Sequence, residues 1–172
     1  MSRAFVKEDE GEKAPMIPPR ASLPAGVPNY VTPRGMRLLK EEKRQLEGER
    51  EEALQKKAET GERYDLELVE GKLKLLQERL HKARVISRPP AQQRDKVRFG
   101  AVVKLRDAAG ALQEYQLVGV DEADVNQGKI GFVAPLARAL MGRGVGERCS
   151  WQRDGETTAM EIVEFYWPEG AD

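Results

Sequence analysis

A run of apolar residues separated alternately by three and four positions dominates the first half of the chain. Its members are Leu66, Val69, Leu73, Leu76, Leu80 and Ala83. This spacing puts all of them on one narrow stripe of a helix, and such a stripe is buried best against a second helix. The upstream stretch offers that partner, because apolar residues recur there at matching intervals: Met36, Leu39, Leu46 and Ala53. Lys43 and Arg50 fill the intervening stripe positions, so this arm is the weaker one.

Capping residues mark the ends of the two arms. Thr32 can accept a hydrogen bond from a free backbone N–H, and Pro33 suits the first position of a helix. Gly61 lies between the stripes, where glycine favours the left-handed conformation that ends a helix. We therefore predict an antiparallel helical hairpin with arms over residues 32–59 and 62–85. The alternative is a helix pair that completes a larger bundle with a partner protein, because the chain offers no third amphipathic helix.

The composition changes on both sides of the hairpin. Residues 1–31 are rich in proline and poor in large apolar residues, so we expect a mobile tail. The coiled coil occupies residues 32–87, a linker residues 88–96, and a globular domain residues 97–168. Short β-branched runs in that domain predict strands over residues 100–106, 112–120, 129–134, 145–153 and 157–166. With one short helix after Pro135, the domain is expected to be a mixed sheet, and the fold class α+β.

The charge balance and the rare residues exclude several classes of protein. Basic and acidic residues number 29 each, which argues against non-specific nucleic-acid binding by the whole protein. No apolar run approaches the ~18 residues of a membrane span, and no secretion signal opens the chain. The single cysteine, Cys149, and the single histidine, His81, exclude an internal disulfide and a multi-histidine metal site. We expect a cytoplasmic protein without membrane association, and no metal bound by the free protein.

Several segments together resemble one protein family. They are Val118-Gly119-Val120-Asp121-Glu122-Ala123-Asp124, Gly128-Lys129-Ile130 and Ala134-Pro135-Leu136-Ala137-Arg138-Ala139-Leu140-Met141-Gly142. In this combination they look like the C-terminal domain of the bacterial Gre transcript-cleavage factors. The ends of the predicted hairpin resemble the ends of that family's coiled coil: Thr32-Pro33-Arg34-Gly35 and Ala83-Arg84-Val85-Ile86. The opening is similar to that of the tailed GreB-type members: Ser2-Arg3-Ala4-Phe5-Val6-Lys7-Glu8-Asp9.

The resemblance implies a fold and a mode of action. The globular domain would have an FKBP-like fold and dock on the rim of the RNA polymerase secondary channel, which the coiled coil would enter. Acidic residues at the tip would help to hold the second catalytic Mg²⁺ of the polymerase, which itself cleaves the backtracked transcript. The chain would be a transcription elongation factor and not an enzyme. It would be a monomer without a cofactor of its own, and it would meet the nascent RNA 3′ end only indirectly.

The predicted tip keeps part of the family's acidic pattern. The family places an aspartate after a glycine and a glutamate three residues later, whereas here Gly61 is followed by Glu62 and then by Asp65. Two carboxylates one helical turn apart can share one Mg²⁺ or its waters. The Asn-Ala-Glu-Tyr run that follows in the family is replaced here by Leu66-Glu67-Leu68. The alternative is that both acids are ordinary solvated residues at the start of a helix.

Further candidate contacts lie near the tip and in the globular domain. Lys56, Lys57 and Arg63 could contact RNA phosphates, or else belong to an ordinary charged helix surface. The resemblance assigns docking on the polymerase to six residues: Asp121, Glu122, Asp124, Pro135, Leu136 and Arg138. Pro135 and Leu136 have the plainer alternative of starting and packing the short helix.

The predicted arms are shorter than those of the family's cleavage factors by about seven residues each, or ~10 Å of reach. This leaves two hypotheses open. The first is a factor that stimulates transcript cleavage. The second is a regulator that occupies the secondary channel of the polymerase without activating cleavage. A structural or adaptor protein unrelated to polymerase is disfavoured by the C-terminal motif.

Overall fold

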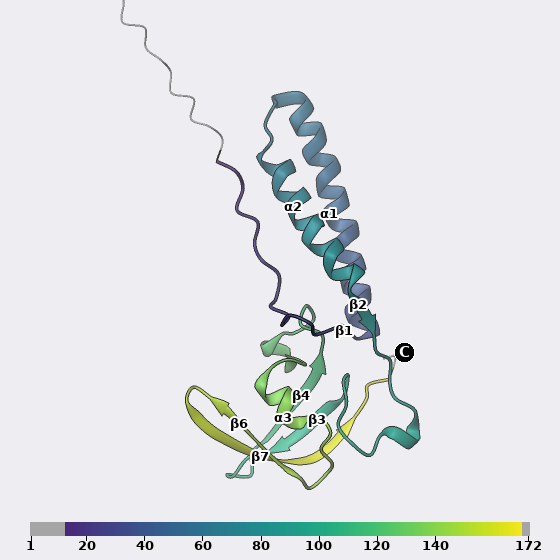
Figure 1. Cartoon of the computed structure of the whole chain (residues 1–172), viewed down its shortest axis with the longest axis vertical. Coiled ribbons are helices and arrows are strands. Elements are labelled where there is room, and N and C mark those ends of the chain that lie inside the picture. The colour runs from purple at the N-terminus through teal and green to yellow at the C-terminus, as the bar shows by residue number, and fades with distance from the viewer. Residues whose placement is uncertain (1–12, 170–172) are drawn as a thin grey trace, which may run out of the picture.

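Figure 1 shows the computed structural model of the chain, which describes residues 13–169. A helical hairpin projects from one side of a small curled sheet, and the segment before the hairpin runs alongside it. The α+β class, the antiparallel hairpin and the mixed sheet with one short helix are confirmed. Among the described residues, no helix combines the length and the apolar character needed to cross a membrane.

The first arm, α1 (Pro33–Thr60), begins and ends where its capping residues predict. Thr32 Oγ1 accepts a hydrogen bond from the Gly35 N–H at 2.8 Å, which satisfies a free donor of the first turn. Gly61 adopts a φ of 77° and donates its N–H to the Lys57 C=O at 2.9 Å. A glycine tolerates this left-handed conformation without steric cost, so the helix stops there.

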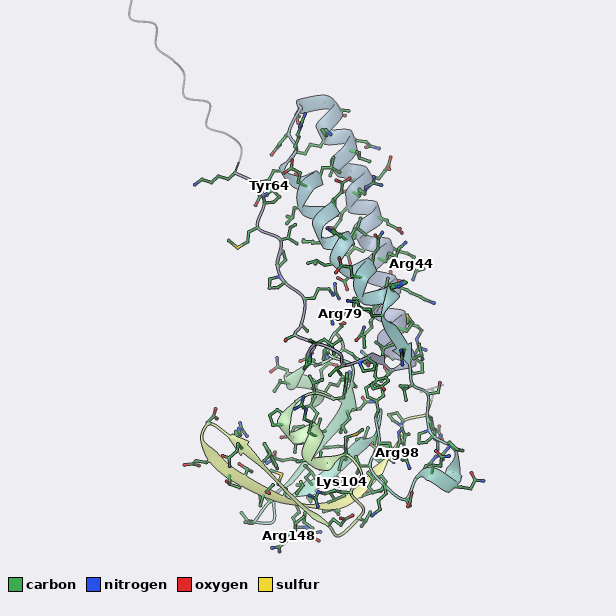
Figure 2. All side chains as sticks on the ribbon, viewed as in Figure 1. Arg44, Tyr64, Arg79, Arg98, Lys104 and Arg148 are labelled. Carbon is green, nitrogen blue, oxygen red and sulfur yellow. The ribbon has the colours of Figure 1, made fainter. Side chains whose placement is uncertain are left out.

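The second arm, α2 (Tyr64–His81), packs its stripe against that of α1. The buried members of the two stripes are Leu39, Leu46, Ala53, Leu66, Val69, Leu73 and Leu76. Charged side chains project from the remaining faces of both arms, as Figure 2 shows. Arg50 of α1 and Glu70 of α2 form one ion pair between the arms, at 3.3 Å. The stripe spacing therefore predicted the hairpin core correctly.

Two short strands at the base of the hairpin differ from the predicted arms. β2 (Ala83–Val85) was expected to continue the second arm, and β1 (Asn29–Val31) was expected in the tail. Instead the two strands pair in parallel, with Asn29 opposite Ala83. Strands of three residues are too short to show a period in the sequence. The first twelve residues of the predicted tail lie outside the described part of the chain.

The C-terminal part is a five-stranded mixed sheet in the order β5-β4-β3-β7-β6. Its strands are β3 (Val102–Arg106), β4 (Leu112–Val118), β5 (Lys129–Gly131), β6 (Arg148–Arg153) and β7 (Glu156–Tyr166). Neighbouring strands are antiparallel except β4 and β5. α3 (Pro135–Leu140) contributes Leu136, Ala137 and Leu140 to a core that also contains Cys149. β4 is shorter than predicted because the chain leaves the sheet after Val118.

The base of the hairpin rests on the loop after β4. The ring of Tyr30 in β1 lies 5.5 Å from that of Phe132 and 6.2 Å from that of Phe99, measured between centroids. The backbone of β1 passes Gly119 so closely that a Cβ atom on residue 119 would stand 2.7 Å from the Tyr30 carbonyl oxygen. Only glycine fits this approach, because the obstacle is backbone. The close packing fixes the position of β1 above the sheet.

Candidate functional site

The hairpin tip is a three-residue loop, residues 61–63, tied to the last turn of α1. Thr60 donates its hydroxyl to the Lys56 C=O at 2.9 Å and accepts the Glu62 N–H at 3.2 Å. α2 begins directly afterwards, so Glu62 lies just before the helix and Asp65 lies in its first turn. The short loop therefore presents both acids at the far end of the hairpin from the sheet.

Both tip acids are paired with one lysine. Lys56 Nζ lies 2.6 Å from Asp65 Oδ2 and 2.9 Å from Glu62 Oε2. Hydrogen bonds, first to Asp65 and then to Glu62, stabilise the charged ammonium of Lys56 and raise its pKa above the ordinary value. All three side chains are well exposed, and ion pairs in solvent are weak and exchange readily.

The geometry of the tip suits a shared cation. Two carboxylates that reach the same ammonium lie close enough to share another cation, and Mg²⁺ prefers carboxylate oxygens. The spacing in the sequence predicted that Glu62 and Asp65 would be neighbours. The sequence reasoning assigned Lys56 to RNA and missed its pairing with the two acids. In the described chain, Lys57 and Arg63 form no ion pair, and their contact with RNA stays a prediction.

The acidic loop after β4 forms a second cluster, at the base of the hairpin. Asp121 Oδ1 lies 3.0 Å from Arg20 Nη2, and its Oδ2 lies 3.0 Å from Arg79 Nε. Only 8% of the Asp121 side chain is exposed. Arg20 belongs to the segment before β1, and Arg79 belongs to the last turn of α2. This single carboxylate therefore joins three parts of the chain.

The neighbouring acid, Glu122, holds the start of α1. Its Oε2 accepts a hydrogen bond from the Thr32 hydroxyl, and its Oε1 lies 3.0 Å from Arg34 Nη1. The Glu122 side chain is only 3% exposed. Gly35 lies beside it, and a Cβ atom there would stand 2.7 Å from Glu122 Oε2, so a larger residue at this position would displace the carboxylate. Asp121 and Glu122 thus connect the sheet to the hairpin, a role that differs from the predicted docking on a partner.

The other four predicted docking residues divide into two pairs. Asp124 is half-buried and accepts hydrogen bonds from the Asn126 N–H at 3.0 Å and from the Gln127 side chain at 2.8 Å. Leu136 is buried in the core of the sheet, as the plainer alternative expected. Pro135 and Arg138 are exposed on α3. Of the six residues, these two are the exposed ones, and Asp124 is partly accessible.

Comparison with known proteins places the chain in a family. It is 36% identical over 149 residues to the transcription elongation factor GreA of Alkalilimnicola ehrlichii, covering 78% of this chain and 94% of that protein. The chain belongs to the Gre family. The transcription elongation factor GreA of Neisseria meningitidis serogroup A is 34% identical over 149 residues, which again cover 78% of this chain and 94% of that protein. The family model for the C-terminal part of transcription elongation factor GreA/GreB matches residues 92–166.

Two solved structures are similar to this Gre-family chain. GreA factor homolog 1 of Thermus thermophilus is 22% identical, with 81% of this chain and 99% of that chain covered and a TM-score of 0.39. The transcription elongation factor GreA/GreB of Nitrosomonas europaea is 24% identical, with 53% and 75% covered and a TM-score of 0.41.

The tertiary structure adds two residues to the cluster around Asp121, and the sequence reasoning missed both. Arg20 and Arg79 both bind Asp121, from segments far apart in the chain. Arg20 stands in a proline-rich stretch that contains few other charges, which is the one signal that could have drawn attention to it. No local pattern marks Arg79, because charged residues are common along both arms of the hairpin.

Proposed function

We propose that this Gre-family chain binds RNA polymerase at the rim of the secondary channel and stimulates the polymerase to cleave backtracked transcripts. The convergence of Glu62 and Asp65 on one cation, at the end of the hairpin farthest from the sheet, carries this proposal. The relatives are named transcription elongation factors, and this supports a role in transcript elongation for the present chain. The chain would act as a monomer, with the hairpin in the channel and the sheet outside it.

In this proposal the chain's own residues position groups and do not form a complete active site. The polymerase would supply Mg²⁺, and the chemistry of that ion would be to activate a water for attack on the phosphodiester. Glu62 and Asp65 would release Lys56 and turn their oxygens toward that ion and its waters. The exposure of the three side chains favours such an exchange, because no desolvated pair has to be broken. Lys57 and Arg63 would then face the RNA phosphates.

Docking outside the channel would use the exposed face of α3. Pro135 and Arg138 lie there, beside the loop after β5. The buried carboxylates of Asp121 and Glu122 would act indirectly, by holding the hairpin on the sheet. Interface energy usually rests on several anchors, so Pro135→Ala alone should weaken binding only modestly.

A regulator that occupies the channel without activating cleavage is the second candidate, and two observations favour it. Lys56 already pairs with both acids and offsets one of their two negative charges. The second arm, α2, has only 18 residues, which corresponds to a length of about 27 Å. If the tip stops short of the active centre, its carboxylates cannot reach the ion whatever their charge.

Transcript cleavage in a purified backtracked elongation complex tests the proposal. The wild-type chain should release short RNA 3′ fragments, and the variant with both Glu62→Ala and Asp65→Ala should not, at equal occupancy of the polymerase. Glu59→Ala is the matched control, because Glu59 is exposed near the tip and, within the described structure, forms no ion pair. A wild-type chain that binds at saturation but leaves the cleavage rate at its intrinsic value would establish the second candidate.

A further inference from the structure

The segment before β1 lies along the hairpin instead of leaving it. Figure 1 shows this segment, in purple, running from the base of the hairpin beside α2. Its Ile17 side chain sits on Gly71 of α2, where a Cβ atom would stand 2.6 Å from Ile17 Cγ1. A glycine in the middle of a helix costs stability relative to alanine, but here the missing side chain leaves room for Ile17. Gly71 provides the notch that admits Ile17.

Arg20 is the main polar tie of this segment. Its guanidinium binds Glu42 of α1 through Nη1 at 2.7 Å and Nη2 at 3.0 Å, and it binds Asp121 of the acidic loop through Nε at 3.1 Å. Only 19% of the side chain is exposed, and a two-pronged contact of this kind fixes orientation as well as distance. One side chain therefore links α1 to the sheet.

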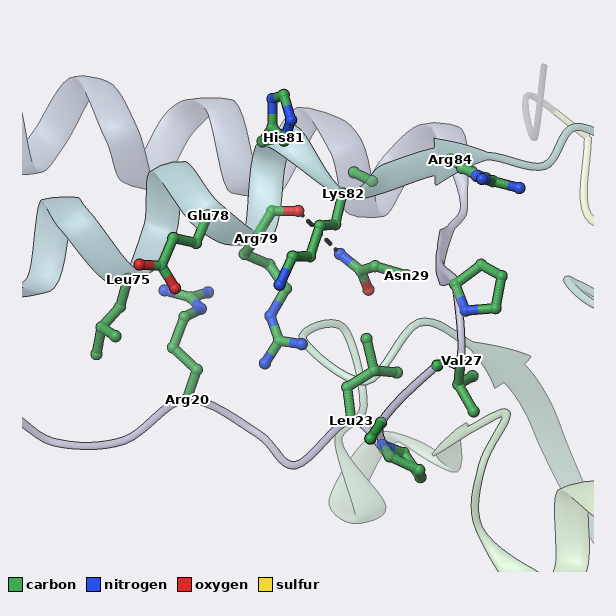
Figure 3. A pocket seen from close by; sticks show the side chains of 15 residues that line it. Arg20, Leu23, Val27, Asn29, Leu75, Glu78, Arg79, His81, Lys82 and Arg84 are labelled. Carbon is green, nitrogen blue, oxygen red and sulfur yellow. Dashed lines mark hydrogen bonds between the residues drawn. The ribbon is translucent and has the colours of Figure 1, made fainter.

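Arg79 of α2 completes the connection from the other arm. It donates a hydrogen bond to the Ala21 C=O of the segment and binds Asp121 at 3.0 Å. Its own C=O accepts the Asn29 side-chain amide at 3.2 Å, the contact drawn in Figure 3. A space of about 760 Å³ remains between residues 20–29 and the end of α2. The segment is therefore held at a few points and is not packed along its whole length.

The distance of the Arg20 contacts from the base of the hairpin determines how strongly they resist tilting of the hairpin. Without them, the described hairpin meets the sheet through its base: Thr32 and Arg34 with Glu122, and Tyr30 with the rings beneath it. Glu42 lies nine residues after the first residue of α1, or about 14 Å along the helix from that base. A tie at this distance from the pivot resists tilting far better than a contact at the pivot itself.

We propose that residues 17–29 form a strap that sets the direction of the hairpin relative to the sheet, with Arg20 as the positioning residue that closes it. The strap fixes the hairpin from both arms, because Arg20 links α1 to Asp121 of the acidic loop and Arg79 links α2 to the same carboxylate. Loss of Arg20 frees the hairpin to tilt on its base without unfolding either part. A consequence that rests on the proposed function is that a tilting hairpin delivers its tip to the polymerase active centre less often.

Distances between spin labels test the strap on the free protein, without polymerase. One label is placed at the tip by Glu59→Cys and one on the exposed β3–β4 turn by Ala108→Cys, while the buried Cys149 stays unlabelled. The otherwise wild-type chain should give one narrow distance distribution. Arg20→Ala should broaden it by about twofold or more, because a hairpin without its upper tie populates several directions. Arg20→Lys should fall between, since an ammonium cannot replace the two-pronged guanidinium.

Two further variants keep this test decisive. Arg148→Ala removes an exposed arginine of β6, at the far side of the sheet from the hairpin in Figure 2, and should leave the distribution unchanged. Glu42→Ala removes the acceptor of Arg20 on α1 and should broaden the distribution if Arg20→Ala does not fold. Distributions for Arg20→Ala or Glu42→Ala as narrow as wild type, in folded protein, would overturn the strap. Broadening combined with unchanged transcript cleavage would retain the strap and reject only its consequence for polymerase.

Discussion

Replacement of Thr32 by alanine tests how the hairpin is joined to the sheet. Its hydroxyl has two roles: it caps α1 by accepting the Gly35 N–H, and it donates to the buried Glu122 carboxylate. Loss of a cap costs about 1 kcal/mol. Loss of a hydrogen bond to a buried charge costs about 2 kcal/mol more. Arg34 remains on the same carboxylate, but it is 48% exposed, so it offsets little of the loss. We expect Thr32→Ala to destabilise the chain by about 3 kcal/mol.

Urea unfolding followed by circular dichroism at 222 nm measures this cost, because the helical signal comes mainly from the hairpin. Thr32→Ser keeps the hydroxyl and should lie within about 0.5 kcal/mol of wild type. In a Glu122→Gln background, Thr32→Ala should cost about 1 kcal/mol less, since a neutral amide loses less than a carboxylate when its donor is removed. A cost below about 1 kcal/mol for Thr32→Ala, or an equal cost for the serine variant, would refute the shared role.

Three further predictions concern the tip, the strap and the core. Lys56→Met removes the ammonium that competes for the tip acids, so transcript cleavage should saturate at a lower Mg²⁺ concentration; an unchanged Mg²⁺ dependence would show that Lys56 does not compete. Gly71→Ala should stabilise an Ile17→Gly variant by about 1 kcal/mol, as it would in an open helix. In the wild-type chain the same change should give no gain, because the added Cβ displaces Ile17. Equal effects of Gly71→Ala on thermal unfolding in both backgrounds would contradict the contact between Ile17 and Gly71. Burial raises the pKa of the Cys149 thiol, so the folded chain holds its proton at pH values where the unfolded chain loses it. The free energy of unfolding should therefore fall as the pH rises above the ordinary thiol pKa, and Cys149→Ala should remove that part of the slope. A Cys149 that reacts with a thiol reagent as fast in the native chain as in urea would contradict the burial.

The elements of this chain follow from local sequence patterns. The apolar stripes, the Thr32 cap and the Gly61 stop are patterns of residues a few positions apart, so the hairpin can be predicted from them without knowledge of the tertiary structure. The same holds, apart from their exact ends, for the five strands of the sheet and for the α3 start at Pro135, whereas β1 and β2 were not predicted. The spacing of Glu62 and Asp65 likewise placed two acids together at the tip.

The connections between these elements were decided by the tertiary structure alone. The resemblance assigned Asp121 and Glu122 to a docking surface, and acidic residues are usually exposed, yet folding places both side chains between the sheet and the hairpin. Asp121 meets Arg20 across 101 positions of the chain, and Glu122 meets Thr32 across 90. Periodicity and capping carry no information over such distances. Which acid is buried, and which arginine neutralises it, depends on how the finished helices and strands pack, and only the folded chain contains that arrangement.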